Sequence, residues 1–297
     1  MINKKRLSVV AMMLSGILLF SGCNLFDKGP EKSPEEIVKE AMLKSYDVKS
    51  GDYSITFDAE LTNVAVAEDV GFKTLAFDGQ VSGVYDVRDL ASPKMSVVMQ
   101  LQGKRDEAEK DEKLNAELRF LGDKAYMILN EITDLEGNLP MVFVEPFKNQ
   151  WYSIPVPQDV IDTALSGYKD EASLSEEEKK LKELYKNMML FSDLKYEGSD
   201  EIYDADSYKY SGKLDREALK QYLVEVSKVS GAGLTPADTA DMDKFFEKMT
   251  LDVELWISKS DIMLRKMSAK ANIKDLEGMD IVLEVGYGLP TLGGDVK

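Results

Sequence analysis

The sequence predicts an α+β fold built around a meandering antiparallel sheet, and three observations indicate it. Apolar and polar residues alternate over several segments of about ten residues, as in strands that bury one face. A helix start signal precedes the first of these segments, and further helix signals lie between residues 175 and 248. Three more alternating segments close the chain after residue 250. Strands and helices that are grouped rather than interleaved favour an antiparallel sheet with segregated helices.

The first helix is expected to begin after residue 33. Ser33 suits the N-cap, Pro34 suits the first helical position, and Glu36 completes a capping box. Apolar residues then recur on one face from Ile37 to Tyr46. This face is expected to pack against the rest of the domain.

A block of strands follows this helix. Gly79 and Gly83 lie inside one of the alternating runs and suggest a bend in a curved sheet. The charged stretch 104–113 is interpreted as a hairpin tip, and Gly122-Asp123 as a turn. The expected strands cover residues 53–61, 75–87, 95–101, 114–120, 124–130 and 151–154.

Helices and then strands complete the chain. Ser175 and Thr235 each open a helix start signal, and Asp215 caps a third helix between them. Residues 196–210 lie between the helices that begin at Ser175 and Asp215, and they are expected to be extended. The closing strands are expected at 251–258, 262–273 and 279–287.

Composition excludes several classes of function. The formal net charge is −17, histidine is absent and cysteine occurs once. An acidic surface of this kind repels nucleic-acid phosphates, so nucleic acid is not an expected partner. Without histidine the chain forms no Ser–His or Cys–His nucleophile, and a single cysteine forms no intrachain disulfide.

No catalytic or metal-binding constellation emerges among the carboxylates. The acidic runs 107–112 and 176–178 are interpreted as solvated faces rather than a glycosidase-like acid pair. The stretch Asp200–Asp206 offers oxygen ligands but lacks the spacing of an EF-hand loop, so it is interpreted as a solvated turn. The chain is therefore predicted to be no enzyme and to hold no cofactor or metal. An extracytoplasmic hydrolase that uses carboxylates is the alternative, although no acid pair is nominated for it.

The N-terminus has the features of an export signal. Lys4, Lys5 and Arg6 precede an apolar run that ends at Phe20. This run is too short for a bilayer, which needs about 20 residues, but it suits a signal peptide. The string 19–23, Leu-Phe-Ser-Gly-Cys, resembles the lipobox of bacterial lipoproteins, with Phe20 where leucine is commonest.

The lipobox resemblance implies how the chain is divided. Residues 1–22 are expected to be a lipoprotein signal peptide, and Cys23 to carry a diacylglyceryl group with palmitate-like acyl chains. Residues 23–33 are then the lipidated cysteine and tether, and 34–297 a single domain anchored to the cell membrane on its extracytoplasmic side. The alternatives are an ordinary secretory signal with an incidental cysteine, or an uncleaved anchor.

The closing hairpin carries a further resemblance. The hairpin consists of the strand Leu251–Ser258, the turn Lys259-Ser260-Asp261 and the strand Ile262–Ser268. It resembles the Trp-containing hairpin of the LolA/LolB-like and LppX/LprG-like lipoprotein superfamily. Ser258 stands where aspartate is commoner, and the helical insert at about 158–250 exceeds the minimal family pattern. The resemblance implies a curved antiparallel half-barrel, covered by α-helices, whose apolar interior binds acyl chains in relatives.

The leading functional hypothesis is a membrane-anchored lipoprotein that binds or carries a lipid or other hydrophobic ligand. The alternative is a structural or protein-interaction lipoprotein with a filled core, because small barrels are often packed solid. The candidate residues for the hydrophobic cavity are the apolar side chains Phe57, Leu61, Phe77, Val97, Met99, Leu118, Leu255 and Ile257.

Overall fold

The computed structural model describes residues 29–62, 74–105, 111–133, 145–158, 160–161, 165, 168, 174–229, 234–276 and 279–292. The predicted signal peptide, Cys23 and the start of the tether lie outside these residues. The chain divides into two units, Met1–Ser33 and Pro34–Lys297. The second unit contains the sheet and its helices.

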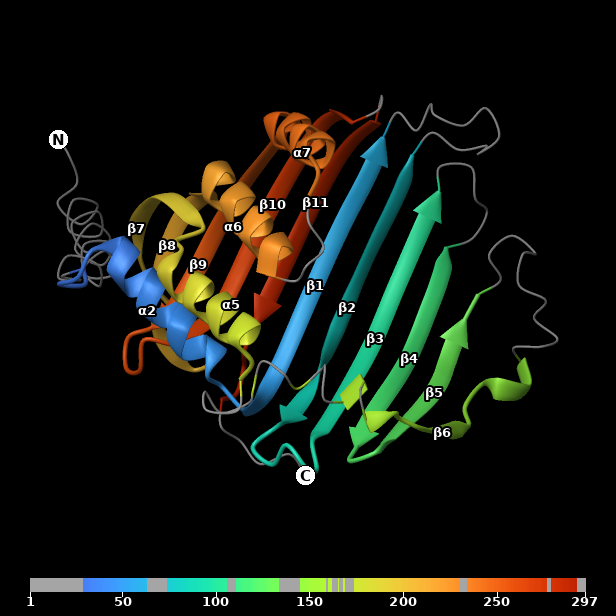
Figure 1. The fold of residues 1–297 in the computed structure, drawn as a ribbon. Helices are drawn as coiled ribbons and strands as arrows, with labels where there is room; N and C mark the ends of the chain where they lie inside the picture. Colours follow the sequence, from blue (N-terminus) through green and yellow to red (C-terminus); the bar gives the residue numbers. More distant parts are fainter. Residues whose placement is uncertain are drawn as a thin grey trace, which may run out of the picture. The chain divides into compact units, whose positions relative to one another are not determined.

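One open antiparallel sheet of eleven strands dominates the described residues (Figure 1). Its strand order is β6-β5-β4-β3-β2-β1-β11-β10-β9-β8-β7, so the first and last strands of the chain pair at the centre. Two meanders run outward from this central pair, and β6 and β7 are the edges. The strands are β1 (Ser50–Thr62), β2 (Leu75–Asp86), β3 (Lys94–Arg105), β4 (Glu112–Leu121), β5 (Lys124–Ile132), β6 (Trp151–Pro155), β7 (Phe191–Ile202), β8 (Ala205–Leu214), β9 (Met249–Ser258), β10 (Leu264–Leu276) and β11 (Met279–Gly288).

The strand register places the apolar residues on one face. Directly paired residues of antiparallel strands point to the same side of the sheet. One such row crosses eight strands and consists of Tyr210, Leu255, Met267, Tyr287, Ile55, Val81, Met99 and Ala116. We call this side the inner face. The neighbouring row of Thr56, Gln80, Gln100 and Asn115 points to the other side, the outer face.

Four helices accompany the sheet in the described residues: α2 (Pro34–Tyr46), α5 (Glu176–Asn187), α6 (Arg216–Val229) and α7 (Pro236–Lys248). Helix α2 contacts β7, β9 and β10, α7 contacts β9 and β10, and α5 contacts α6. In Figure 1 the four helices lie over the β7–β11 half of the sheet, and none of the four lies over β2–β5. The prediction that helices cover the sheet is therefore not confirmed for strands β2–β5.

The helix starts follow the sequence signals. Helix α2 begins at Pro34, as predicted. The Asp215 carboxylate accepts a hydrogen bond of 2.9 Å from the Ala218 backbone N–H at the start of α6. Thr235 and Asp238 form a complete capping box at the start of α7. None of the helices in the described residues is long and apolar enough to cross a membrane.

The predicted extended stretch 196–210 is a hairpin. Strands β7 and β8 are joined by a turn at Tyr203 and Asp204, which have φ angles of 52° and 60°. The acidic stretch Asp200–Asp206 therefore spans the end of this hairpin. Among the described residues, no three acidic or cysteine side chains lie close enough together to hold a metal ion.

Two glycines of β2 make room for aromatic side chains of β1. A Cβ at Gly79 would lie 2.5 Å from the Phe57 ring. A Cβ at Gly83 would lie 1.8 Å from the Ser96 carbonyl oxygen, to which the Tyr53 hydroxyl donates a hydrogen bond of 3.3 Å. Close approach of neighbouring groups is thus what requires glycine at both positions.

Candidate functional site

The helix-covered half of the inner face is a packed core. Val38 and Ala41 of α2 meet Tyr210, Leu255 and Ile257 of the sheet, and all five are 0% exposed. A second cluster lies under α7, where Phe246 packs with Met249 and Ile273. The inner face over β7–β11 is therefore filled by the protein's own side chains.

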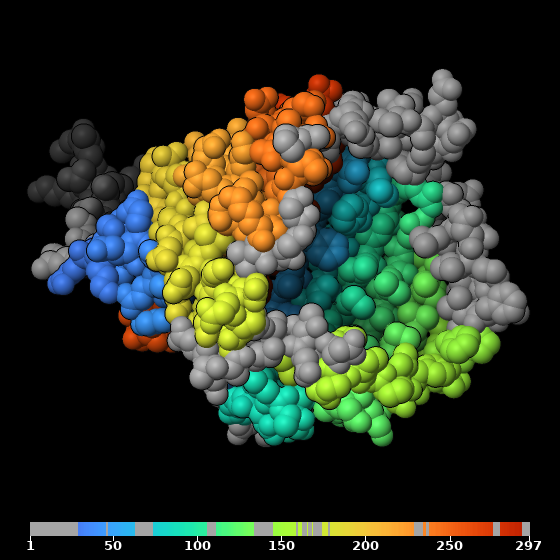
Figure 2. Space-filling model, in the orientation of Figure 1, coloured from blue at the N-terminus to red at the C-terminus, as the bar shows by residue number. Residues whose placement is uncertain are grey.

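The other half of the inner face is incompletely covered. Phe77 is 37% exposed and Met127 is 42% exposed, and Ile154 at the edge is 55% exposed. Figure 2 shows the molecular surface hollowed over β1–β3, between the helices and the outer strands of this half. A contiguous apolar surface of this kind commonly marks a binding site. We call it the open half, and it comprises the inner faces of β1–β5.

The structure divides the eight candidate residues into two sets. Leu255 and Ile257 of β9 belong to the packed cluster under α2. The other six share the inner face of the open half, where Phe77 is exposed and the remaining five are half-buried. They are Phe57, Leu61, Phe77, Val97, Met99 and Leu118. That these residues contact a ligand stays a prediction.

Further residues complete the open half. Val81 pairs with Met99, Leu101 pairs with Leu114, and Met127 pairs with Leu118, so all share the inner face. Their positions in the alternating runs mark them as apolar-face residues in the sequence. Sequence reasoning did not select them as site residues, because their place beside the six depends on the register between strands.

Tyrosines gather at one end of the open half and on the elements beside it. Tyr53 of β1 and Tyr85 of β2 lie with ring centroids 6.3 Å apart, and Tyr287 of β11 is on the same face. Burial raises the pKa of the Tyr85 hydroxyl, and the nearby Tyr168 and Tyr287 raise it further. Burial likewise raises the pKa of the Tyr287 hydroxyl, and the nearby Tyr168 and Tyr185 raise it further. We call Tyr53, Tyr85, Tyr168, Tyr185 and Tyr287 the tyrosine group.

An ion pair marks the opposite end of the open half. Arg105 of β3 pairs with Leu75 of β2, and Glu112 of β4 pairs with Gly103 of β3, which places both side chains on the inner face. The Arg105 guanidinium bonds to the Glu112 carboxylate, and both side chains are largely buried. This end of the face therefore carries two charges that offset each other.

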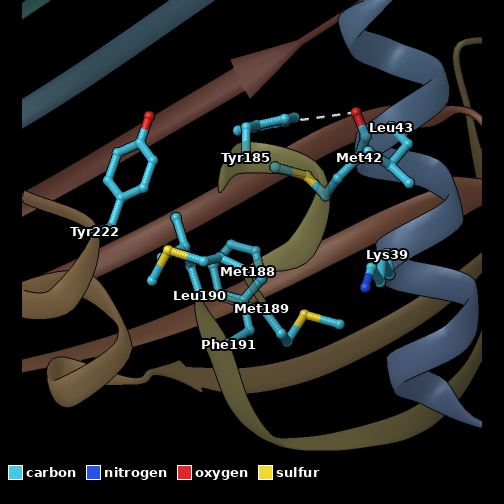
Figure 3. A pocket seen from close by; sticks show the side chains of 9 residues that line it. All are labelled: Lys39, Met42, Leu43, Tyr185, Met188, Met189, Leu190, Phe191 and Tyr222. Carbon is cyan, nitrogen blue, oxygen red and sulfur yellow. Dashed lines mark hydrogen bonds between the residues drawn. The ribbon is translucent and has the colours of Figure 1, made fainter. Parts of the chain in front are cut away.

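A small pocket lies between α2, α5 and α6 (Figure 3). Met42, Met188 and Met189 line it, and the Tyr185 hydroxyl donates a hydrogen bond of 3.5 Å to the Met42 carbonyl oxygen. Its cavity volume is about 30 Å³, which is one water's share of liquid volume. The pocket has no room for an acyl chain in this conformation.

No protein-family model and no curated protein matches this chain. Among solved structures it is similar to LprF from Mycobacterium bovis, at 12% identity and a TM-score of 0.38 over 89% of this chain and 94% of that chain. It is also similar to the lipoprotein LppX from Mycobacterium tuberculosis, at 8% identity and a TM-score of 0.34 over 90% and 99% of the two chains. A β-barrel-like protein with a domain of unknown function from Brucella abortus is 9% identical, with a TM-score of 0.27 over 82% and 99%.

LprF and LppX are lipoproteins of the LppX/LprG group, the group that the closing hairpin resembles.

Proposed function

We propose that this chain is a membrane-anchored extracytoplasmic lipoprotein that binds a lipid or other hydrophobic ligand on the open half of its inner face. The observation that carries the proposal is the exposure of large apolar side chains on one half of a face whose other half is buried. Phe77 and Met127 are 37% and 42% exposed, whereas Leu255 is 0% exposed. Burying such side chains against a ligand would release about 25 cal/mol for each Å² of apolar surface.

The register supplies a broad apolar surface for an elongated ligand. Three neighbouring rows cross the strands of the open half, through Val97 and Leu118, through Val81 and Met99, and through Phe57 and Leu101. Rigid strands hold these side chains in place, and Met99 and Met127 can adapt to different ligand shapes. We expect hydrocarbon chains to lie across this surface.

The anchor is the second part of the proposal. Cys23 is the only cysteine in the chain and stands at the position that a lipobox requires. Ten residues, 24–33, separate it from the first helix, and a fully extended segment of this length spans at most about 36 Å. The binding domain would then stay close to the membrane surface, where hydrophobic ligands are available.

The packed half favours a second candidate function. Val38, Tyr210 and Leu255 are completely buried, and the pocket beside them has a volume of only about 30 Å³. A lipoprotein with this filled core would use the open half to dock a partner protein instead of a lipid.

Binding of a fluorescent monoacylglycerol to the purified protein tests the proposal. Phe77→Glu places a charge on the open half and should weaken binding about 10-fold, because roughly 1.5 kcal/mol of apolar contact is lost. Val282→Glu is the matched control, since Val282 is 36% exposed and lies on the outer face. Equal binding by both variants would contradict the site. Absence of binding by the unmodified protein, with no co-purifying lipid, would favour the second candidate.

A further inference from the structure

The open half is chemically asymmetric along its strands. At one end are the phenols of Tyr53 and Tyr85, and Tyr287 lies beside them on the neighbouring strand β11. Towards the other end the inner face carries only hydrocarbon side chains such as Phe57, Leu61 and Leu75, until the Arg105–Glu112 ion pair. An amphiphile that lies along the strands would therefore meet hydrogen-bonding groups at one end and hydrocarbon over the rest.

Two phenols of the tyrosine group have unused hydrogen-bonding capacity. Tyr53 donates to the Ser96 carbonyl oxygen, and Tyr185 donates to the Met42 carbonyl oxygen. Within the described residues, no hydrogen bond joins the hydroxyl of Tyr85 or Tyr287 to another residue. Both side chains are half-buried, and Tyr287 also packs against the cluster under α2.

We infer that the tyrosine group is the subsite for the polar end of the ligand, and that this ligand is an uncharged amphiphile whose ester or hydroxyl oxygens bond to Tyr85 and Tyr287. This inference rests on the proposed function, because it assumes that the open half binds a hydrophobic ligand. It adds the chemical class of the ligand and its direction along the strands.

Three observations favour an uncharged ligand over an anionic one. The electrostatic neighbours that shift the pKa values of Tyr85 and Tyr287 are other tyrosines, and the raised values keep the phenols protonated as donors. On the inner face of the described strands β1–β5, the cation is Arg105, which is bonded to Glu112. The net charge of −17 also repels an anion.

A competition experiment tests this inference on the full chain purified from cells and stripped of bound lipid. The protein is incubated with an equimolar mixture of monoolein, oleate and octadecane, and the bound molecules are extracted and quantified by mass spectrometry. The variants are Tyr85→Phe/Tyr287→Phe, which keeps both rings, and the control Tyr126→Phe, which lies on the outer face of β5.

We expect the unmodified protein and Tyr126→Phe to take up monoolein in preference to oleate. The double variant should lose about 10-fold of its monoolein uptake, because it lacks both phenol hydrogen bonds and a tenfold change corresponds to about 1.4 kcal/mol. Its octadecane uptake should be unchanged, which also shows that the variant is folded. Uptake of all three molecules without dependence on the two hydroxyls would overturn the inference and leave the proposed function standing. Uptake of none by the unmodified protein would overturn both.

Discussion

At the scale of single residues, some glycines of the open half allow side chains and backbone of neighbouring strands to approach them closely. The Phe57 ring and Leu101 side chain both lie within 3 Å of where a Gly79 Cβ would be. Gly103 differs, because a Cβ there would be no closer than 3.6 Å to its nearest neighbour, Glu112. Glycines on the same face therefore serve different purposes, and only some are sterically required.

Gly83→Ala should destabilise the protein by about 1–3 kcal/mol, because the added methyl group meets the Ser96 carbonyl oxygen of the neighbouring strand. Gly103→Ala is the matched control and should be neutral or slightly stabilising, since its Cβ has ordinary contacts and alanine restricts the unfolded chain. Urea denaturation measures both. Equal free energies of unfolding for the two variants would contradict the steric argument.

Tyr210 presents a different residue-scale feature. Its side chain is 0% exposed, and its hydroxyl has no hydrogen-bond partner within the described residues. A buried polar atom without a partner costs about 1–3 kcal/mol. Burial also raises the pKa of the Tyr210 hydroxyl above its ordinary value of 10.0, and the nearby Tyr208 and Tyr196 raise it further.

Tyr210→Phe should therefore increase the free energy of unfolding at neutral pH by about 1 kcal/mol. Above pH 10 the unfolded chain loses the phenol proton while the folded chain keeps it, so this residue's contribution to stability falls as pH rises. In urea titrations, the difference in free energy of unfolding between Tyr210→Phe and the unmodified protein should grow from roughly pH 8 to pH 10.5. A constant difference across that range would show that the hydroxyl is hydrated in the folded protein.

At the scale of elements, α2 connects the start of the domain to the closing hairpin. The Lys44 ammonium donates to the Asp261 carbonyl oxygen at 2.8 Å, and the Ser45 hydroxyl accepts from the Leu264 backbone N–H at 3.2 Å. Earlier in the helix, Val38 and Ala41 are completely buried against the sheet. The helix is thus a structural part of the packed half.

Val38→Ala should cost about 2 kcal/mol of stability, because it removes two methyl groups from a fully buried site. Glu35→Ala, on an exposed position of the same helix, should change stability by less than about 0.5 kcal/mol. Thermal unfolding compares the two variants. If ligand binding is confined to the open half, Val38→Ala should leave affinity unchanged below its unfolding transition.

The elements themselves were largely predictable, but their arrangement was not. Alternation of apolar residues identified β1 to β5 and the closing strands, since one buried face dictates that pattern. A solvated turn was predicted within Asp200–Asp206, but the division of residues 196–210 into the two paired strands β7 and β8 was not, because Tyr203 and Asp204 adopt positive φ angles without the Asn-Gly signal that usually marks a hairpin turn. The pairing of β1 with β11 depends on contacts far apart in sequence, so the division of the candidate residues between two halves could not be read from the pattern.

At the scale of the whole molecule, the sheet serves two purposes on one face. Over β7–β11 the helices bury the apolar side chains and supply the stability of a domain without disulfides. Over β1–β5 the same kind of surface stays accessible, with Phe77 and Met127 exposed. The proposed ligand would bury this remaining surface, so bound lipid should itself stabilise the fold by mass action.

The anchor can be tested on the same scale. Cys23→Ala removes the thiol that the lipobox cysteine would use, so the variant should incorporate no labelled palmitate and should keep its signal peptide. Phe20→Leu is the control and should be labelled at least as well as the unmodified chain, because leucine is the commoner lipobox residue at that position. Labelling followed by gel mobility and membrane fractionation measures both variants. Palmitate on Cys23→Ala would refute the lipobox, and the domain would then need another route to the membrane.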